Sequence, residues 1–204
     1  LEYSGNAISE LPIRPIAFET SPACRTRYLS EAKALYEHGV AQDDLASLLA
    51  FVDKRLRQEP EQSDVVHDLL AHLAEQMMAM HKERQAEVKG FLDWLAREMG
   101  ADLEELTGRS RLQNYLGNYQ KGEPHLTLEG LLDILRQNRQ RLKIDTSARA
   151  FQARLEQEYQ VSLDKLLPLK TRLAFTDRLI DLVVYRLYGL TEEEVAIVEG
   201  RGSV

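Results

Sequence analysis

The chain has a single cysteine, Cys24, among its 204 residues. One thiol cannot form an intramolecular disulfide, and it cannot supply the thiolate cluster of a structural zinc site. A disulfide-stabilised domain and a cysteine-rich zinc domain are therefore excluded. Because scarce cysteine is typical of proteins kept in a reducing compartment, we expect a cytoplasmic location.

Long apolar stretches are also missing. No run approaches the roughly 18–20 uninterrupted apolar residues of a membrane span. The chain does not open with basic residues followed by an apolar stretch, as a secretion signal would. We therefore expect no membrane partner. The opening sequence, LEYSGNAISELPIRPIAF, contains two prolines and no helical period, and it looks like a fragment cut from a longer polypeptide.

The short motifs of common catalytic centres are absent too. The sequence has no GxxxxGK, GxGxxG or HExxH motif. Three histidines share one predicted helix, but spacings of five (His67 to His72) and nine (His72 to His81) do not place them on one face, as metal ligands require. Two E-x-K triplets, at 31–33 and 87–89, lie in predicted helices without a suitable upstream acid. We therefore expect no catalytic residue, no metal site and no cofactor in this chain.

Apolar residues at helical spacing fill most of the sequence. They recur every three or four residues from Asp64 to Met99 and follow heptads from Ser147 to Tyr188, which predicts two long coiled-coil-like helices. Gly100 and Gly189 should end them, and Gly90 is the weakest point of the first. Pro168 should kink or split the second, because an interior proline loses a backbone hydrogen bond. Three seam positions are predicted to be buried, namely Leu166, Leu173 and Ile180.

Shorter helices are predicted around these two. One should cover residues 25–37 and end at Gly39, and another should run from Asp43 or Asp44 to Gln58. Thr127 should cap a helix over residues 128–142, with three arginines near its end that suit the helix dipole.

These patterns predict an all-α fold, an elongated helical bundle with two long coiled-coil-like helices and a short extended N-terminal segment. Thr191 and Glu194 form a capping box for a last helix that ends at Val198. The extended segment covers residues 1–20 and the helical domain covers residues 21–204. A loop with two glycines and a proline, at 117–126, is the best candidate for a hinge.

Positive charge is concentrated in the middle of the chain. The formal net charge is −7, which argues against a protein that coats nucleic acid indiscriminately. Between Arg109 and Arg154, however, nine Lys or Arg stand against four acids, a balance of +5, whereas the remainder has 17 against 29, a balance of −12. Cations and amides bind phosphates and base edges. The candidate DNA contacts are Arg109, Arg111, Asn114, Lys121, Arg136, Arg139, Arg141 and Lys143.

A structural interpretation of the same segment stays open. Tyr115 and Leu116 could pack into the core beneath a loop that is only solvated. The charge pattern alone does not separate this interpretation from DNA binding.

The C-terminal sequence RLIDLVVYRLYGLTEEEVAIVEG resembles the C-terminal ends of large single-chain type IIG restriction-modification enzymes and related adenine-specific DNA methyltransferases. In these enzymes a V-Y-x-L-Y-G-L-T-x-E-E sequence closes the chain. LPIRPIAF is similar to the exit from their target-recognition region, and DVVHDLLAHLAEQMMAM with KGFLDWL is similar to their helical spacer. The matching residues of the tail are Val184, Tyr185, Leu187, Tyr188, Gly189, Leu190, Thr191, Glu193 and Glu194.

The resemblance implies a bacterial parent that uses S-adenosylmethionine to methylate adenine N6 at specific DNA sites. In some members a nuclease, and with it magnesium, belongs to the same polypeptide. The methylase signature N-P-P-Y or D-P-P-Y, which holds the flipped base, is absent here. We therefore expect a non-catalytic spacer and scaffold that supports target recognition and contributes DNA backbone contacts. Its expected partners are double-stranded DNA and the upstream methyltransferase and recognition domains, with residues 1–20 leading in from the latter.

Two alternatives stay open. The chain could be a protein-interaction or dimerisation module, a homodimer for example, in which the 147–188 seam pairs with another chain and DNA is not contacted. It could also be a helical enzyme without a recognised motif. Salt-dependent DNA binding favours the scaffold, whereas a concentration-dependent mass without DNA favours dimerisation.

Overall fold

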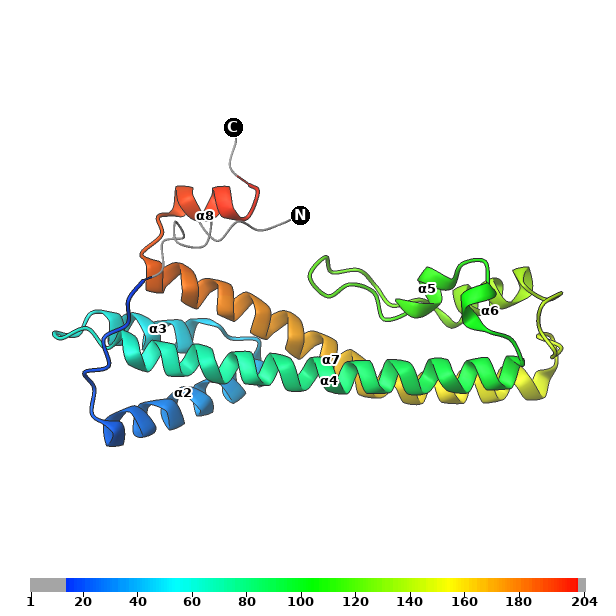
Figure 1. Cartoon of the computed structure of the whole chain (residues 1–204), viewed down its shortest axis with the longest axis horizontal. Helices are drawn as coiled ribbons and strands as arrows, with labels where there is room; N and C mark the ends of the chain where they lie inside the picture. Colours follow the sequence, from blue (N-terminus) through cyan, green and yellow to red (C-terminus); the bar gives the residue numbers. More distant parts are fainter. Residues whose placement is uncertain (1–13, 202–204) are drawn as a thin grey trace, which may run out of the picture. The chain divides into compact units, whose positions relative to one another are not determined.

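The computed structural model describes residues 14–201 and confirms the all-α class and the helical bundle. The described residues contain no strand, and none of their helices is long and apolar enough to cross a membrane. Residues 14–20 of the predicted lead-in have no regular structure, and residues 1–13 lie outside the described part. The elements, drawn in Figure 1, are α2 (Pro22–Gln42), α3 (Ala46–Leu56), α4 (Ser63–Met99), η1 (Leu103–Glu105), α5 (Arg109–Gln113), α6 (Leu128–Gln137), α7 (Arg149–Tyr188) and α8 (Glu192–Val198).

The two predicted long helices are α4 and α7, and both start within two residues of the predicted positions. Gly90 does not interrupt α4, and Gly100 ends it in a left-handed conformation with φ +61°. The predicted split at Pro168 was wrong, because α7 continues through it. Pro168 is exposed, and fully buried Leu166 and Leu173 hold the helix on both sides of it.

The chain divides into two compact units, and both long helices contribute to each. Among the described residues, unit 1 covers 14–74 and 178–201, with α2, α3, the start of α4, the end of α7, and α8. Unit 2 covers 75–177, with the rest of both long helices and η1, α5 and α6.

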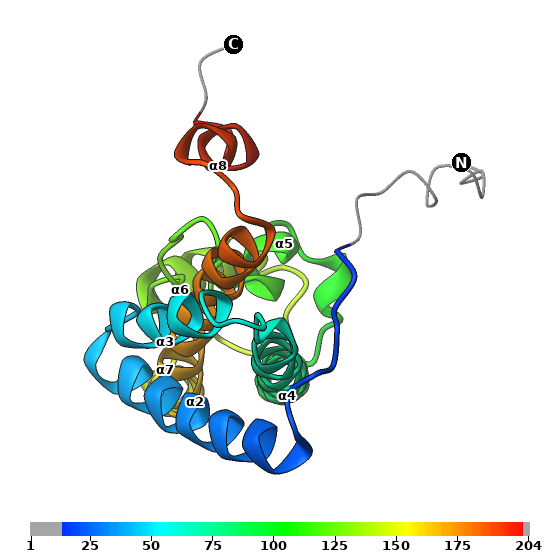
Figure 2. The same ribbon diagram turned by 90° about the vertical axis from the view of Figure 1, so that its left-hand side faces the viewer.

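In unit 1, α2 and α3 lie side by side next to the first turns of α4 (Figures 1 and 2). The prediction that Gly39 ends its helix was wrong, since α2 runs to Gln42 and Asp43 takes the left-handed cap position with φ 55°. Gly39 is buried inside the helix, and its carbonyl accepts the capping N–H. A glycine that is buried inside a helix can therefore be mistaken, in the sequence, for the residue that ends the helix. The next helix, α3, ends at Leu56, two residues before the predicted end.

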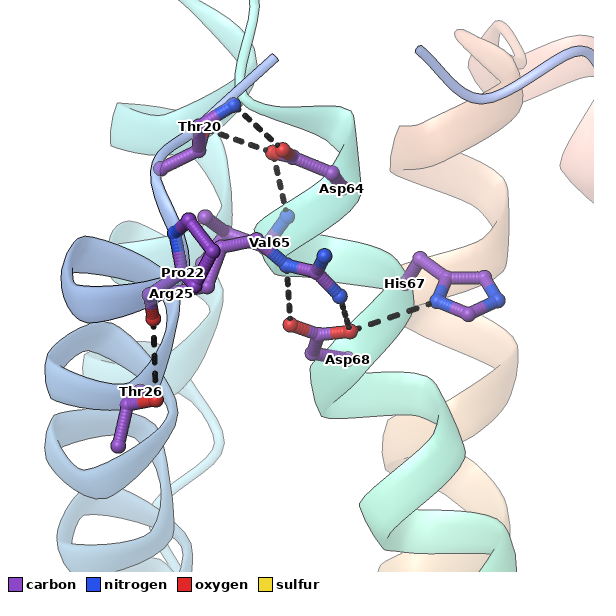
Figure 3. A network of polar contacts seen from close by, with 8 residues as sticks. All are labelled: Thr20, Pro22, Arg25, Thr26, Asp64, Val65, His67 and Asp68. Atoms are coloured by element: carbon purple, nitrogen blue, oxygen red, sulfur yellow. Dashed lines mark hydrogen bonds and ion pairs between the residues drawn. The ribbon is translucent and has the colours of Figure 1, made fainter. Parts of the chain in front are cut away.

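Polar contacts fasten the segment before α2 to the start of α4 (Figure 3). The carboxylate of Asp64 lies in the first turn of α4, where it accepts the N–H and hydroxyl of Thr20, both at 2.8 Å. One turn further on, Asp68 accepts Nε of Arg25 at 2.8 Å and Nη2 at 2.5 Å. This bidentate bond from Arg25 holds the pKa of Asp68 below its ordinary value.

The core of unit 2 is built between the two long helices. Phe91 and Leu95 of α4 pack in one cluster with Leu155 and Tyr159 of α7, together with apolar residues of α5 and α6. Tyr115 is fully buried in this cluster, and its hydroxyl lies 2.6 Å from Oγ of Ser162 on α7. Burial raises the pKa of Tyr115 to about 12. Within unit 2 the two long helices are therefore partners in the same core.

The predicted α7 seam is correct at two of its three tested positions. Leu166 and Leu173 have no exposed surface, whereas Ile180 is half-buried and its neighbour Leu179 is fully buried. The departure from the heptad is confined to this position, because Leu187, seven residues beyond Ile180, is buried again.

The helix after Thr127 is shorter than predicted. The hydroxyl of Thr127 accepts the N–H of Gly130 at 3.0 Å, as expected of the cap, but α6 ends at Gln137 instead of Leu142. Arg139 and Arg141 therefore lie beyond the helix and do not serve its dipole. The cause is Asn138, a buried side chain that bonds both backbone groups of Thr107.

Candidate functional site

All eight predicted DNA-contact residues lie in unit 2, on or around α5, α6 and their connections. Arg109 and Arg111 belong to α5, Asn114 follows it, and Lys121 lies in the loop at 117–126. Arg136 belongs to α6. The remaining three, Arg139, Arg141 and Lys143, lie in the connection to α7.

Three of these cations already have partners inside the chain. Nη1 of Arg109 lies 2.9 Å from Glu104, and Nη1 of Arg136 contacts both Glu129 at 2.7 Å and Asp133 at 2.9 Å. A guanidinium N–H of Arg141 donates to the carbonyl of Glu105. Carboxylates thus offset the charge of Arg109 and Arg136, and a phosphate would have to compete with them.

The other four cations are Arg111, Lys121, Arg139 and Lys143, here called the unpaired cations. All four are exposed, and none has a carboxylate partner within residues 14–201. Exposed ion pairs contribute little to the free energy of unfolding. Whether a cation is paired therefore matters more for ligand binding than for the stability of the fold. The unpaired cations keep their full charge available to an anion.

Arg111 and Asn114 line a cleft of about 510 Å³. Its polar side chains come from the end of α5 and from the segment that leads into α6, and one carboxylate, Glu123, lies among them. The other lining residues are Ser110, Gly117, Pro124, His125, Leu126 and Thr127. Tyr115 and Leu116, between these positions, are 0% and 2% exposed, so the core role suggested for them is confirmed.

The loop at 117–126 has a defined backbone. Gly117 adopts φ +73°, and a Cβ there would lie 2.4 Å from the carbonyl oxygen of Pro124, so only glycine fits. The N–H of Leu126 donates to the carbonyl of Tyr115 at 2.6 Å. Lys170 of α7 donates to the carbonyls of Leu116, at 2.6 Å, and Glu123. These bonds hold the backbone at both ends of the loop, and the hinge suggested here stays a prediction.

A second pocket, of about 260 Å³, contains two residues that were not among the predicted DNA contacts. His81 and Arg84 come from α4, one turn apart, and face Asn114 and the loop. The other lining residues are Asn118, Tyr119 and Gln120. Arg84 lies outside the basic segment between Arg109 and Arg154. The pocket joins α4 to loop residues about 35 positions further along the chain. Their three-residue spacing on one helix is the only sequence signal they carry.

Asn114 lines both pockets, so the cleft and the second pocket are neighbours. The connection after α6 forms a different recess of about 520 Å³, lined by Arg136, Arg139 and Asp145 among others. The stem of Lys143 packs against Gly100, where an added Cβ would lie 2.9 Å from its Cδ. The predicted contact residues thus separate into two groups, one around Asn114 and one after α6.

Metal-ligating side chains do not gather in the described part of the chain. Among residues 14–201, no three His, Cys, Asp or Glu residues form a group that could hold a metal ion. His67 lies 3.6 Å from Asp68 in unit 1, and His81 lies in the second pocket of unit 2.

Comparison of the chain with protein-family models, curated proteins and solved structures gave no match. The resemblance of the C-terminal sequence therefore rests on its residues alone. Its predicted local structure is confirmed: Gly189 ends α7 with φ +66°, and Thr191 and Glu194 form the reciprocal capping box of α8. This local structure explains the tail as a helix stop and restart.

Proposed function

We propose that this chain is the non-catalytic C-terminal helical segment of a bacterial restriction-modification enzyme that methylates adenine. In this role it supports target recognition and binds DNA phosphates through unit 2. The observation that carries the DNA part is the set of unpaired cations, exposed beside amide side chains and without carboxylate partners in the described chain.

The chemistry of these groups favours phosphate over bases. Guanidinium and ammonium groups donate to phosphate oxygens, and such contacts position a protein on the duplex without reading its sequence. Arg111 and Asn114 line an open cleft beside a fixed loop, which suits a backbone contact. Recognition of particular bases is assigned to the upstream domain of the parent.

The distribution of charge between the units supports the same assignment. Unit 2 has 16 Lys or Arg and 16 acids, whereas unit 1 has 10 and 17 and thus carries the whole net charge of −7. An acidic unit repels phosphate, and a neutral unit with local cations does not. We therefore place DNA contact on unit 2 and contact with the upstream domains of the parent on unit 1.

Cofactor binding and methyl transfer belong, in this proposal, to the upstream part of the parent. S-adenosylmethionine, and magnesium where a nuclease is present, would act there. We place the parent in the cytoplasm, where bacterial DNA is accessible.

The test is a titration of a labelled duplex at two salt concentrations. Arg111→Ala with Lys121→Ala removes two unpaired cations, and Arg109→Ala with Arg136→Ala removes two paired ones. Both variants lower the net charge equally, so a difference between them reports direct contact and not the overall field. We expect the first variant to bind more weakly and to flatten the slope of log affinity against log salt by about 0.9 for each lost phosphate contact.

We expect the paired-cation variant to keep a slope close to that of the unaltered chain. The unaltered chain should bind the duplex weakly, with a Kd of ~10⁻⁴ to 10⁻⁶ M, as is typical of non-specific association. Equal affinities and equal slopes for both variants would remove the DNA part of the proposal and leave only the scaffold role.

A further inference from the structure

The second pocket of unit 2 is walled by hydrogen-bonding side chains. His81 and Arg84 come from α4, Asn114 follows α5, and three residues come from the loop at 117–126. None of its six lining residues is a carboxylate. Its volume of about 260 Å³ far exceeds the ~10–15 Å³ that a single water needs, so the pocket has room for a phosphate group.

Arg84 is the unsatisfied group of this pocket. Its Nε is buried without a hydrogen-bond partner, and its guanidinium has no ion pair within the described residues. Burial raises the pKa of Tyr119 and lowers the pKa of Lys170, and the nearby charge of Arg84 opposes the first change and adds to the second. A buried donor of this kind costs free energy unless a ligand or water accepts its hydrogen bond.

Other hydrogen-bonding groups belong to residues that line the same pocket. Oδ1 of Asn118 accepts the N–H of Gln120 at 2.9 Å, whereas its amide nitrogen has no hydrogen-bond partner among residues 14–201. The hydroxyl of Tyr119 lies 3.5 Å from Nε2 of His81. Together with Arg84 these groups can donate several hydrogen bonds to one anion.

Three carboxylates near the pocket bond groups other than Arg84. Asp177 accepts the side-chain amide of Gln120 at 3.2 Å, and Glu87 pairs with Lys165 at 2.9 Å. Glu123 accepts the backbone N–H of Asn118 at 3.0 Å. None of the three neutralises Arg84 directly, so an anion can enter the pocket without displacing an internal salt bridge.

We infer that this pocket is a binding site for a single phosphate group, held by Arg84 with Asn114, Asn118 and His81. The inference deepens the proposed function, because a phosphate of the DNA backbone is the natural source of such a group beside the cleft of Arg111. Free phosphate has the same chemistry, and the two sources are separated by the test.

The test follows the side-chain nuclear magnetic resonance signals of the His81 imidazole and the Arg84 Nε–H during titration with inorganic phosphate. Sodium chloride at matched ionic strength is the reference. We expect saturable shifts in the unaltered chain and none in Arg84→Gln. Lys82→Gln removes the same charge from the same helix two residues away, on another face, and should behave like the unaltered chain. Arg84→Lys, which keeps the charge but loses the planar donors, should weaken binding about tenfold or more.

A second arm replaces phosphate with a short DNA duplex. Shifts with both ligands assign the pocket to the DNA backbone, and shifts with phosphate alone assign it to a free phosphate ligand. No saturable shift, or shifts that persist in Arg84→Gln while its backbone spectrum is otherwise unchanged, would overturn the inference. DNA binding that depends on Arg111 and Lys121 while these signals stay unmoved would overturn the pocket alone and leave the proposed function standing.

Discussion

At the scale of single residues, buried polar side chains decide local structure. Asn138 is 3% exposed, and its amide bonds the N–H and carbonyl of Thr107, each at 2.9 Å, and the carbonyl of Ile134 at 2.8 Å. It therefore both ends α6 and fixes the segment before α5. Arg84 illustrates the opposite case, a buried donor that no group of the described chain satisfies.

Asn138→Ala should destabilise the chain by ~1–3 kcal/mol, because it removes the three hydrogen bonds that this buried side chain makes with Thr107 and Ile134. Chemical denaturation monitored by circular dichroism measures the free energy of unfolding. Gln137→Ala, at an exposed neighbouring position, is the control and should lie within ~0.5 kcal/mol of the unaltered chain. Equal stability of the two variants would contradict the role given to Asn138.

The pair of Arg25 and Asp68 gives a pH-dependent prediction. The pKa of Asp68 is lowered in the folded chain, chiefly by the hydrogen bonds from Arg25, so its contribution is present above the unfolded pKa of ~3.9 and is lost as pH falls through the folded pKa. Asp68→Asn should therefore lower the free energy of unfolding by ~1 kcal/mol at pH 7.

That difference should disappear as the pH falls well below 4. Chemical denaturation of the unaltered chain and of Asp68→Asn, at a series of pH values between 7 and 3, measures the difference in the free energy of unfolding. Asp93→Asn, at an exposed position of the same helix, should show no such convergence. A stability gap that stays constant down to pH 3 would rule out the linkage.

At the scale of elements, α7 shows how a buried face follows helix geometry. Heptad positions are buried along the helix, among them Leu166, Leu173 and Leu187, but Ile180 is half-buried and the adjacent Leu179 is fully buried. Helix starts depend on local capping groups, as at Thr127 and Thr191. The end of α6 depends instead on a distant segment, since Asn138 bonds the backbone of Thr107.

The difference in burial between Leu179 and Ile180 predicts unequal costs for two adjacent truncations in α7. Leu179→Ala should destabilise the chain by ~2–5 kcal/mol, because it opens a cavity at a fully buried position. Ile180→Ala should cost clearly less, since Ile180 is only half-buried. Thermal unfolding of the two variants compares them, and a larger loss for Ile180→Ala would contradict the burial of the two positions described above.

At the scale of the whole molecule, the apolar faces of the two long helices are used within the chain. In unit 2, residues of α4 and α7 share one core, so the seam over the first half of α7 is not available to a second copy. We therefore expect the isolated chain to be monomeric. This expectation bears on the dimerisation alternative, which the chain's sequence left open.

Sedimentation equilibrium measures the mass directly. We expect a mass near 23.3 kDa that does not change over a hundredfold range of concentration in the absence of DNA. A mass that rises toward twice this value with concentration would favour the dimerisation module over the monomeric scaffold. The same experiment on Leu166→Ala would then show whether the α7 seam is the contact.

The amino-acid sequence by itself determined the features that depend on neighbours three or four residues away. The helical class, the starts of α4 and α7, the caps at Thr127 and Thr191 and the stop at Gly189 all follow from local hydrogen bonds and periodicity. The location of the basic segment followed from counting charges. For these features the interacting groups are close along the chain, so the pattern of residues carries the information.

Only the tertiary structure decided which of those charges are available and which residues meet. Glu104 pairs with Arg109 while Arg111 stays unpaired, and Asn138 stops α6 by bonding Thr107, 31 residues away. Arg84 reaches the loop residues because α4 passes beside them. Such contacts join segments that only the packing of the core brings together, and no periodicity in the sequence encodes them.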